Sequence, residues 1–329
     1  MDNNPLVSIC VPIYGVENYI ERCVRSLFDQ TYERIEYVFV DDCTPDRSIS
    51  IIQQVMQEYP KRAPHVIIVH HSTNSGLAVA RNTGVANATG DFIMWVDGDD
   101  FIDVHTLEKV VRKQSETDAD IVCFDDLMLF KDHSEPDLKN RDYSNNIDFI
   151  LKMLNVTVSH GIWGHLIRRS LYIDNGVKVE AGVNMSEDLQ AMVLLAWYAK
   201  RVVTLHEPLY FYDRSRETSY TNEFRENYIR QTLRTFEILE HFFKDKNAEI
   251  ETALLCVHAD SLAFNMRLTV DQKGYKYLYY QLKKALENID RKYWKTMSNS
   301  TTIAMKFRKS YYLLHIYNLI VGFTKRTKK

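Results

Sequence analysis

The stretch FIMWVDGDDFID, Phe92 to Asp103, guides the interpretation of the whole sequence. Its apolar first half is typical of a buried strand, and Asp97, Asp99 and Asp100 follow within four positions. Carboxylates this close repel one another unless water, a cation or a partner offsets their charge. A cation site mounted on a rigid strand is one interpretation. A solvated turn whose Asp side chains cap the next helix is the other.

The first 130 residues alternate apolar strands with amphipathic helices. We predict helices at 17–30, 44–59, 76–88 and 104–115, with Thr44 as an N-cap before Pro45. Strands are predicted at 6–13, 35–42, 65–71, 91–97 and 119–130. Strands that are apolar throughout and alternate with helices indicate an α/β fold, a parallel sheet covered on both faces. Ligands of such sheets bind beyond the carboxyl ends of the strands, where the polar residues of this sequence gather. This placement favours the cation site over the solvated turn.

Composition narrows the class of protein. The chain has 329 residues, 45% of them apolar, and a formal charge of -3, which argues against a nucleic-acid partner bound through a basic surface. Its five cysteines are scattered without a CxxC pair, which is typical of a reducing compartment. The N-terminal apolar run has no basic flank, and no run reaches the roughly 20 residues of a membrane span. We therefore expect a cytoplasmic location.

Several pieces of the sequence occur together in a familiar order. They are VSICVPIYGVENYIERCVRSLFDQTY, YVFVDDCTPD, NSGLAVARNTGVANATGDFIMWVDGDD, the Trp and Leu of WGHL, SEDL, and PLYFYDR. In these pieces the chain resembles the family 2 inverting glycosyltransferases, over roughly residues 6–214. The resemblance implies a GT-A fold, a Rossmann-like and mostly parallel central sheet with helices on both faces. It implies a catalytic domain over 1–221, with a nucleotide-sugar half at about 1–130 and an acceptor half at about 147–221. Residues 222–329 are predicted to be a helical region with a basic and apolar tail.

The resemblance also implies residues that bind the nucleotide-sugar donor. They are Pro12, Ile13, Tyr14, Glu17, Asp42, Gly76, Arg81, Asp97, Gly98 and Asp99. Asp42 corresponds to the carboxylate that accepts a hydrogen bond from the base, uracil in relatives. Asp97 and Asp99, with Asp100 close by, correspond to a site for Mn²⁺ or Mg²⁺. Arg81 corresponds to an arginine near the diphosphate, and a salt bridge to the aspartates is compatible with the same position.

The acceptor side rests on the same resemblance. Inversion by direct displacement needs one base for the proton of the acceptor hydroxyl. Asp188 corresponds to that base, with Glu187 in support. A purely structural role is open as well, with Ser186 as N-cap and the two acids in the first helical turn. Trp163 and His165 correspond to acceptor residues, and Arg214 is a candidate for the diphosphate or a plain surface arginine.

The predicted function is metal-assisted, inverting transfer of a sugar from a nucleotide sugar, expected to be UDP-linked, to a saccharide or lipid-linked acceptor in cell-surface polysaccharide or glycan assembly. A nucleotidyltransferase would favour a GxGxxR loop and a dinucleotide oxidoreductase a GxGxxG loop. The first turn, PIYGVENY, has neither. A membrane-associated scaffold that binds nucleotide without turnover is the non-enzymatic alternative.

The tail carries a separate prediction. Residues 311–323, YYLLHIYNLIVGF, are apolar and flanked by basic residues. This pattern favours peripheral contact with an anionic membrane face, the inner one for a cytoplasmic protein. A helix docked on the protein itself, or a contact between two copies, is the alternative.

Overall fold

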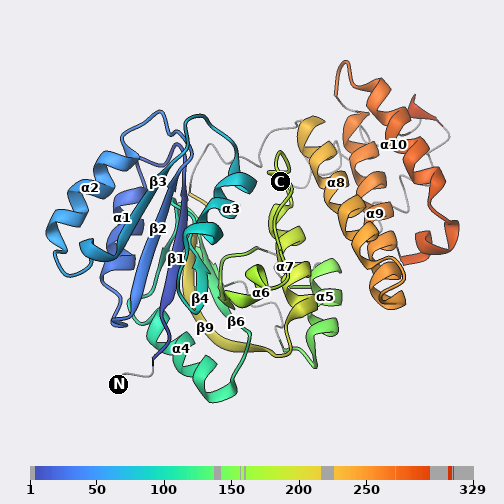
Figure 1. The fold of residues 1–329 in the computed structure, drawn as a ribbon. Helices are drawn as coiled ribbons and strands as arrows, with labels where there is room; N and C mark the ends of the chain where they lie inside the picture. Colours follow the sequence, from blue (N-terminus) through green and yellow to red (C-terminus); the bar gives the residue numbers. More distant parts are fainter. Residues whose placement is uncertain are drawn as a thin grey trace. The chain divides into compact units, whose positions relative to one another are not determined.

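The chain is described by a computed structural model that covers residues 4–136, 142–155, 157–158, 161–215, 226–270, 272–296, 310–312 and 314. It divides into two compact units, Met1–Arg225 and Glu226–Lys329 (Figure 1). Most of the predicted tail helix lies outside the described residues. Within them, no helix is both long and apolar enough to cross a membrane.

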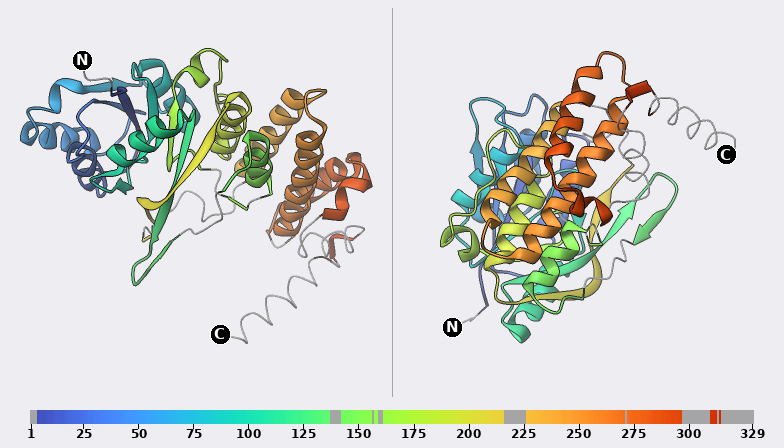
Figure 2. Two further views of the ribbon diagram at one scale, coloured as in Figure 1. Left: turned by 90° about the horizontal axis from the view of Figure 1, so that it is seen from below. Right: turned by 90° about the vertical axis from the view of Figure 1, so that its right-hand side faces the viewer.

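The first unit is built on one mixed sheet. In the described residues its strand order is β3-β2-β1-β4-β8-β6-β9-β5, with β7 paired to β6. The strands are β1 (Val7–Ile13), β2 (Ile35–Asp41), β3 (Val66–His70), β4 (Phe92–Trp95), β5 (Phe101–Ile102), β6 (Ile121–Leu129), β7 (Ser134–Pro136), β8 (His165–Arg168) and β9 (Val202–Asp213). The hairpin of β6 and β7 extends past the rest of the sheet in both views of Figure 2.

Helices cover both faces of the parallel part of the sheet. The helices of this unit are α1 (Ile20–Phe28), α2 (Ser48–Glu58), α3 (Leu77–Asn87), α4 (Thr106–Thr117), α5 (Asn146–Leu154), α6 (Ser170–Ile173) and α7 (Glu187–Tyr198), with a 3₁₀ turn at Ala63–His65. Helices α1 and α2 lie on one face and α3 on the other (Figure 1). The apolar stripe of α1 packs on the side chains of β1 and β2 in one buried cluster. This burial is the main favourable contribution to the fold.

The α/β fold is confirmed, but two details differ from the sequence prediction. Strands β1 to β4 are parallel, whereas β8 lies antiparallel between β4 and β6. The five strands predicted within the first 130 residues do run in one direction, since β4 and β6 are both antiparallel to β8, but β8 comes from beyond residue 130 and separates the last two of them. Helix α2 begins at Ser48 and not at Thr44. The Thr44 hydroxyl accepts a hydrogen bond from Gly15 N and donates one to Asp46, so it takes part in the preceding turn and does not cap the helix.

Strand β9 is one long strand of 12 residues. It runs parallel to β6 with register shifts around Asp125, and its last residues also pair with β5. Its carboxyl end comes back beside the turn that follows β4, where Tyr210 and Asp213 bond Asp100. Sequence-distant segments thus meet at one edge of the sheet.

The second unit is helical in its described part. Its helices are α8 (Glu226–Phe243), α9 (Ala248–Thr269) and α10 (Lys276–Asn288), followed by a 3₁₀ segment at Arg291–Thr296. Helix α9 packs against both α8 and α10. The side chain of Asn247 caps α9 by accepting hydrogen bonds from two backbone amides, Glu249 N and Ile250 N.

Candidate functional site

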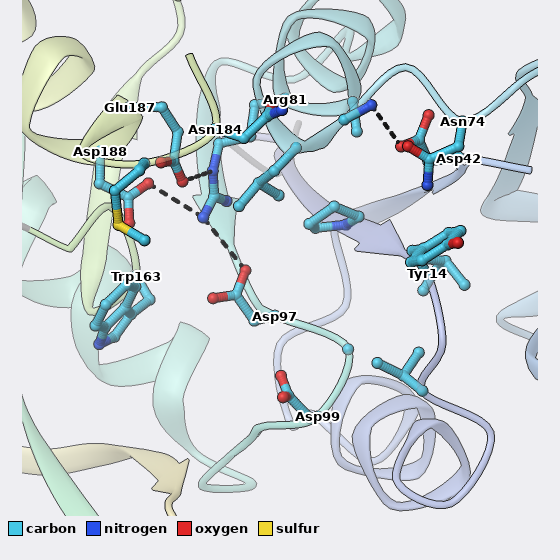
Figure 3. Close-up of a pocket in the computed structure, with 18 of the residues that line it drawn as sticks. Tyr14, Asp42, Asn74, Arg81, Asp97, Asp99, Trp163, Asn184, Glu187 and Asp188 are labelled. Atoms are coloured by element: carbon cyan, nitrogen blue, oxygen red, sulfur yellow. Dashed lines mark hydrogen bonds and ion pairs between the residues drawn. The ribbon is translucent and has the colours of Figure 1, made fainter. Parts of the chain in front are cut away.

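A cavity of about 670 Å³ opens at the carboxyl ends of β1, β2 and β4 (Figure 3). Sheet edges of this kind are where α/β proteins bind ligands. Most of the sequence-predicted site residues line it: Pro12, Ile13, Tyr14, Asp42, Gly76, Arg81, Asp97, Gly98, Asp99, Trp163, Glu187, Asp188 and Arg214. Glu17, Asp100 and His165 are not among its lining residues.

At one end of the cavity, an exposed ring lies near a buried carboxylate. Tyr14 is 51% exposed, while Asp42 is buried. Asp42 Oδ1 accepts hydrogen bonds from His71 Nδ1 at 2.7 Å and Ser75 N at 2.8 Å, and Oδ2 accepts one from Gly76 N at 2.8 Å. A carboxylate has about four acceptor positions, so these bonds leave Oδ2 able to accept from a ligand.

The segment after β1 adopts a turn that places Glu17 away from the cavity. Gly15 has a φ of +67°, in the left-handed region that glycine and asparagine tolerate best. Glu17 Oε2 instead accepts a hydrogen bond from Arg47 N, just before α2. Glu17 therefore joins the first and second turns and is not positioned beside the expected nucleotide.

Helix α3 begins at the cavity and is clamped to the segment before α7. The Asn184 side chain lies against Gly76, so close that a Cβ there would be 2.4 Å from its amide nitrogen. Asn184 Oδ1 accepts from Ala78 N, and further along α3 the Asn82 side chain bonds both N and O of Val179. These bonds fix α3 against the segment of residues 179–184.

Arg81 is the centre of the cavity's charge arrangement. Its Nη2 lies 3.4 Å from Asp97 Oδ1 and 3.1 Å from Asp188 Oδ1, and its Nε lies 3.7 Å from Glu187 Oε1. The guanidinium is almost fully buried and lies 5.3 Å from the centre of the Trp95 ring. One cation thus bridges the carboxylate after β4 and the two acids that open α7 (Figure 3).

The pKa values of these groups reflect their burial. Burial raises the pKa of Asp97 to about 6, with Arg81 opposing the shift and Asp188 and Asp99 adding to it. Burial also raises the pKa of Glu187 well above its usual range, and Asp188 adds to the rise. For Arg81, burial alone would lower the pKa, but the attraction of Asp188, Asp97 and Glu187 outweighs it. The cluster therefore favours a charged arginine between carboxyl groups that resist ionisation together.

The three aspartates after β4 take different positions. Asp97 and Asp99 line the cavity, whereas Asp100 is buried, with Oδ2 accepting from Tyr210 Oη at 2.6 Å and Oδ1 from Asp213 N at 2.8 Å. Arg22 donates to Asp99 O and to Asp213. Asp100 thus holds the turn against β9 and does not face the cavity with the other two.

The residues present suit a divalent cation. Within the described ranges, no group of three or more His, Cys, Asp or Glu side chains is arranged to hold a metal ion. Mg²⁺ is commonly held by one or two protein carboxylates, with phosphate and water oxygens completing its shell. The two cavity-facing carboxylates, Asp97 and Asp99, fit that kind of donor set.

Helix α7 presents its first two residues to the cavity. Ser186 is its N-cap, with a left-handed φ of +65° and no capping hydrogen bond from its side chain, so the expected capping box does not form. Asp188 Oδ1 is buried and pairs with Arg81 Nη2 at 3.1 Å, but among the described residues no donor is oriented to make a hydrogen bond to it. That oxygen retains the capacity to accept a proton from a ligand.

The remaining predicted residues separate into two groups. Trp163 lines the cavity with its ring 5.5 Å from that of Tyr212, and Arg214 lies 5.8 Å from the same Tyr212 ring. His165 begins β8, is buried, and bonds Trp163 O through Nδ1 at 2.7 Å. Trp163 and Arg214 are therefore available to a ligand, while His165 holds the backbone that carries Trp163.

Sequence reasoning missed several lining residues. They are Asn74, Asn184, Met185, Tyr212 and Asp213, with apolar positions between them. Asn184 and Met185 stand directly before the SEDL motif, and Tyr212 and Asp213 stand inside PLYFYDR, so proximity to the quoted motifs was the available signal.

Comparison with known proteins identifies the unit that holds this cavity. The family model described as Glycosyl transferase family 2 matches residues 8–170. This unit belongs to glycosyltransferase family 2. The chain is 32% identical over 217 residues to the uncharacterized glycosyltransferase EpsJ of Bacillus subtilis, an alignment that covers 63% of this chain and 61% of EpsJ. It is 27% identical over 246 residues to the glycosyltransferase GlyG of Streptococcus pneumoniae, covering 70% of this chain and 78% of GlyG.

Solved structures show that the fold is of the GT-A type. A crystal structure of S. aureus TarS 1-349 in complex with UDP-GlcNAc aligns with a TM-score of 0.73 at 17% identity, covering 96% of this chain and 92% of that one. The mannosyltransferase PcManGT from Pyrobaculum calidifontis, in complex with GDP-Man and Mn²⁺, aligns with a TM-score of 0.57 at 18% identity, covering 93% and 88%. These two structures of the same fold were solved with different nucleotide sugars bound, UDP-GlcNAc and GDP-Man.

Proposed function

We propose that this glycosyltransferase transfers a hexose or N-acetylhexosamine from a UDP-linked donor with inversion of the anomeric configuration. It uses a divalent cation for this reaction. The observation that carries the proposal is the composition of one cavity. Asp42 lies at one end and Asp188, beside Arg81, at the other, and Asp97 lies between them with Asp99 nearby (Figure 3). Asp42 suits the nucleotide base, Asp97 and Asp99 suit a cation that binds the diphosphate, and Asp188 suits the reacting hydroxyl.

The donor end suits uracil by hydrogen-bonding chemistry. Uracil carries an N–H that a carboxylate oxygen accepts, and Asp42 Oδ2 has that capacity. A buried site built for such a bond rejects a base that cannot donate it, because the carboxylate would then lack its partner. Pro12 and Ile13 line the cavity beside Tyr14 and supply apolar surface for the flat base.

The reacting groups divide the chemistry between them. Asp97 and Asp99 would hold Mn²⁺ or Mg²⁺, which neutralises charge on the leaving nucleoside diphosphate. Asp188 accepts the proton of the acceptor hydroxyl at Oδ1, and the ion pair with Arg81 keeps that carboxylate in place. Glu187, whose pKa burial raises, supports Asp188 from the same turn of α7.

The acceptor is proposed to be a saccharide, free or lipid-linked, in the assembly of a cell-surface polysaccharide. Trp163 presents an aromatic ring to the cavity, a surface on which a sugar ring can stack. A relative with a named pathway is the minor teichoic acid biosynthesis protein GgaB of Bacillus subtilis, 27% identical over 237 residues, covering 70% of this chain and 25% of that protein.

Binding and turnover test the proposal separately. Calorimetry should show UDP binding that depends on Mn²⁺ in the native protein and is lost in Asp99→Ala. With a panel of UDP-sugars and saccharide acceptors, Asp188→Asn should bind UDP normally and lose about 10²- to 10⁴-fold in turnover. Asp103→Asn, outside the cavity, is the matched control. With an α-linked donor, NMR should show a β-linked product. Retention of the anomeric configuration would overturn the mechanism, and so would full activity of Asp188→Asn.

A further inference from the structure

Two consecutive histidines at the end of β3 bond two consecutive aspartates at the end of β2, where His70 and Asp41 are the last strand residues. His70 Nδ1 lies 2.8 Å from Asp41 Oδ2, and His71 Nδ1 lies 2.7 Å from Asp42 Oδ1. The pairs look alike but their settings differ. Asp42 lines the cavity and Asp41 does not. The His71 side chain is 13% exposed, against 56% for His70.

His71 is held by three hydrogen bonds, two to the end of β2 and the residue after it and one to α3. Its backbone N donates to Asp41 O, which continues the pairing of β3 with β2. Its ring joins Asp42 through Nδ1, and Nε2 lies 2.9 Å from Thr83 Oγ1 on α3. With Nδ1–H donating to the carboxylate, Nε2 accepts from the Thr83 hydroxyl, so both ring nitrogens are satisfied.

The other donors to Asp42 are backbone amides. Ser75 N and Gly76 N belong to the turn that leads into α3, with Gly76 as the N-cap of that helix. His71 supplies a side-chain link from this carboxylate to Thr83 within α3. A carboxylate that reads a base must keep one oxygen aimed at the ligand, and locking it through a neighbour is how proteins hold such groups.

We propose that His71 is a positioning residue for nucleotide selection, acting through Asp42 and stabilised by Thr83. Fixing Oδ1 to the imidazole leaves Oδ2 facing the cavity, ready for a base that donates an N–H. This inference rests on the proposed role of Asp42 in binding uracil. It adds His71 as the residue that determines how strongly the site prefers uracil over other bases.

Comparing UDP with CDP tests the proposal. Uracil donates at N3, whereas cytosine presents an acceptor there, so a fixed carboxylate distinguishes them. In calorimetry with Mn²⁺, the native protein should bind UDP at least tenfold more tightly than CDP. His71→Leu should reduce that preference about three- to tenfold by weakening UDP alone. His71→Asn, which keeps a donor near the Nδ1 position, should restore most of the preference, and His70→Leu should leave it unchanged.

A structural role alone would give a different result. If His71→Leu weakens UDP and CDP equally, or leaves the ratio as in the native protein, the proposal is overturned. If His71→Leu does not fold, Thr83→Val tests the same link, and a native UDP-to-CDP ratio in Thr83→Val would overturn the proposal. A native protein that binds UDP without preference over CDP would instead contradict the base-reading role of Asp42, and the role of His71 with it.

Discussion

Replacement of Gly84 by alanine tests how α3, the helix that carries Arg81, is seated on the sheet. A Cβ at Gly84 would lie 2.7 Å from Trp95 Cη2, which is 0.7 Å short of the 3.4 Å at which ordinary contact begins. Trp95 is fully buried, and its Nε1 donates to Tyr172 Oη at 3.0 Å. The ring therefore cannot move aside without losing that bond, and the helix must shift instead.

The expected cost follows from two opposing effects. Overpacking a filled core costs about 1–3 kcal/mol. Alanine in place of glycine within a helix gains up to about 1 kcal/mol. The free energy of unfolding should therefore fall by about 1–2 kcal/mol in Gly84→Ala. Because Arg81 is three residues earlier and lies over the same Trp95 ring, turnover should fall as well.

Urea unfolding, followed by tryptophan fluorescence, measures this change. Ala86→Gly, at an exposed position of the same helix, is the control that reports helix propensity without the contact. In a Trp95→Phe background the smaller ring should relieve the overlap, so Gly84→Ala should cost less there than in the native protein. An equal cost in both backgrounds would refute the overlap as its cause.

Three further predictions concern the site and its support. Asp97→Asn should have a higher free energy of unfolding than the native protein at pH 7. Burial raises the pKa of Asp97 to about 6, so the native folded state loses stability as the pH rises from about 4 through 6. The asparagine does not ionise and avoids this loss. The advantage should disappear in urea unfolding at pH 4, and its persistence there would contradict the cause. Tyr210→Phe removes a donor from buried Asp100 and should lower the free energy of unfolding by about 1–3 kcal/mol, measured in urea at pH 7; no loss would show that the bond is dispensable. Asn82→Ala breaks both bonds to Val179 and should lower kcat while the Kd for UDP stays within about twofold, measured by turnover and calorimetry; unchanged turnover would refute a role for the clamp.

The parallel core of the fold could be predicted from the sequence because its strands are continuous apolar runs. Strands β1 to β4 all have this pattern, and their carboxyl ends supply much of the cavity. The two-residue β5 and the antiparallel β8 could not be predicted, since neither is long enough for a periodic pattern. Their pairing is decided by tertiary contacts, β5 with β9 and β8 with both β4 and β6.

The candidate site shows the same division. Carboxylates at strand ends, such as Asp42 and Asp97, could be located from position alone. The orientation of neighbouring side chains could not, because it depends on distant partners. Asp100 follows Asp99 directly, yet Tyr210 and the Asp213 amide hold its carboxylate away from the cavity. His71, a strand-end residue in the sequence, acquires its significance only when β2 and β3 pair.

Asn82 holds the main chain of Val179 through two hydrogen bonds, and this has a consequence for how the segment before α7 can vary among related proteins. Both bonds use backbone atoms, so they tolerate any side chain at that position that still fits the buried space. The exposed residues 178, 180 and 181 can therefore change while the segment stays aligned with α3, whereas Gly182, with a φ of +85°, favours glycine. Exchanging these residues between related enzymes would change the surface next to residues 184–188. It would leave the end of the cavity at Asp42 unchanged.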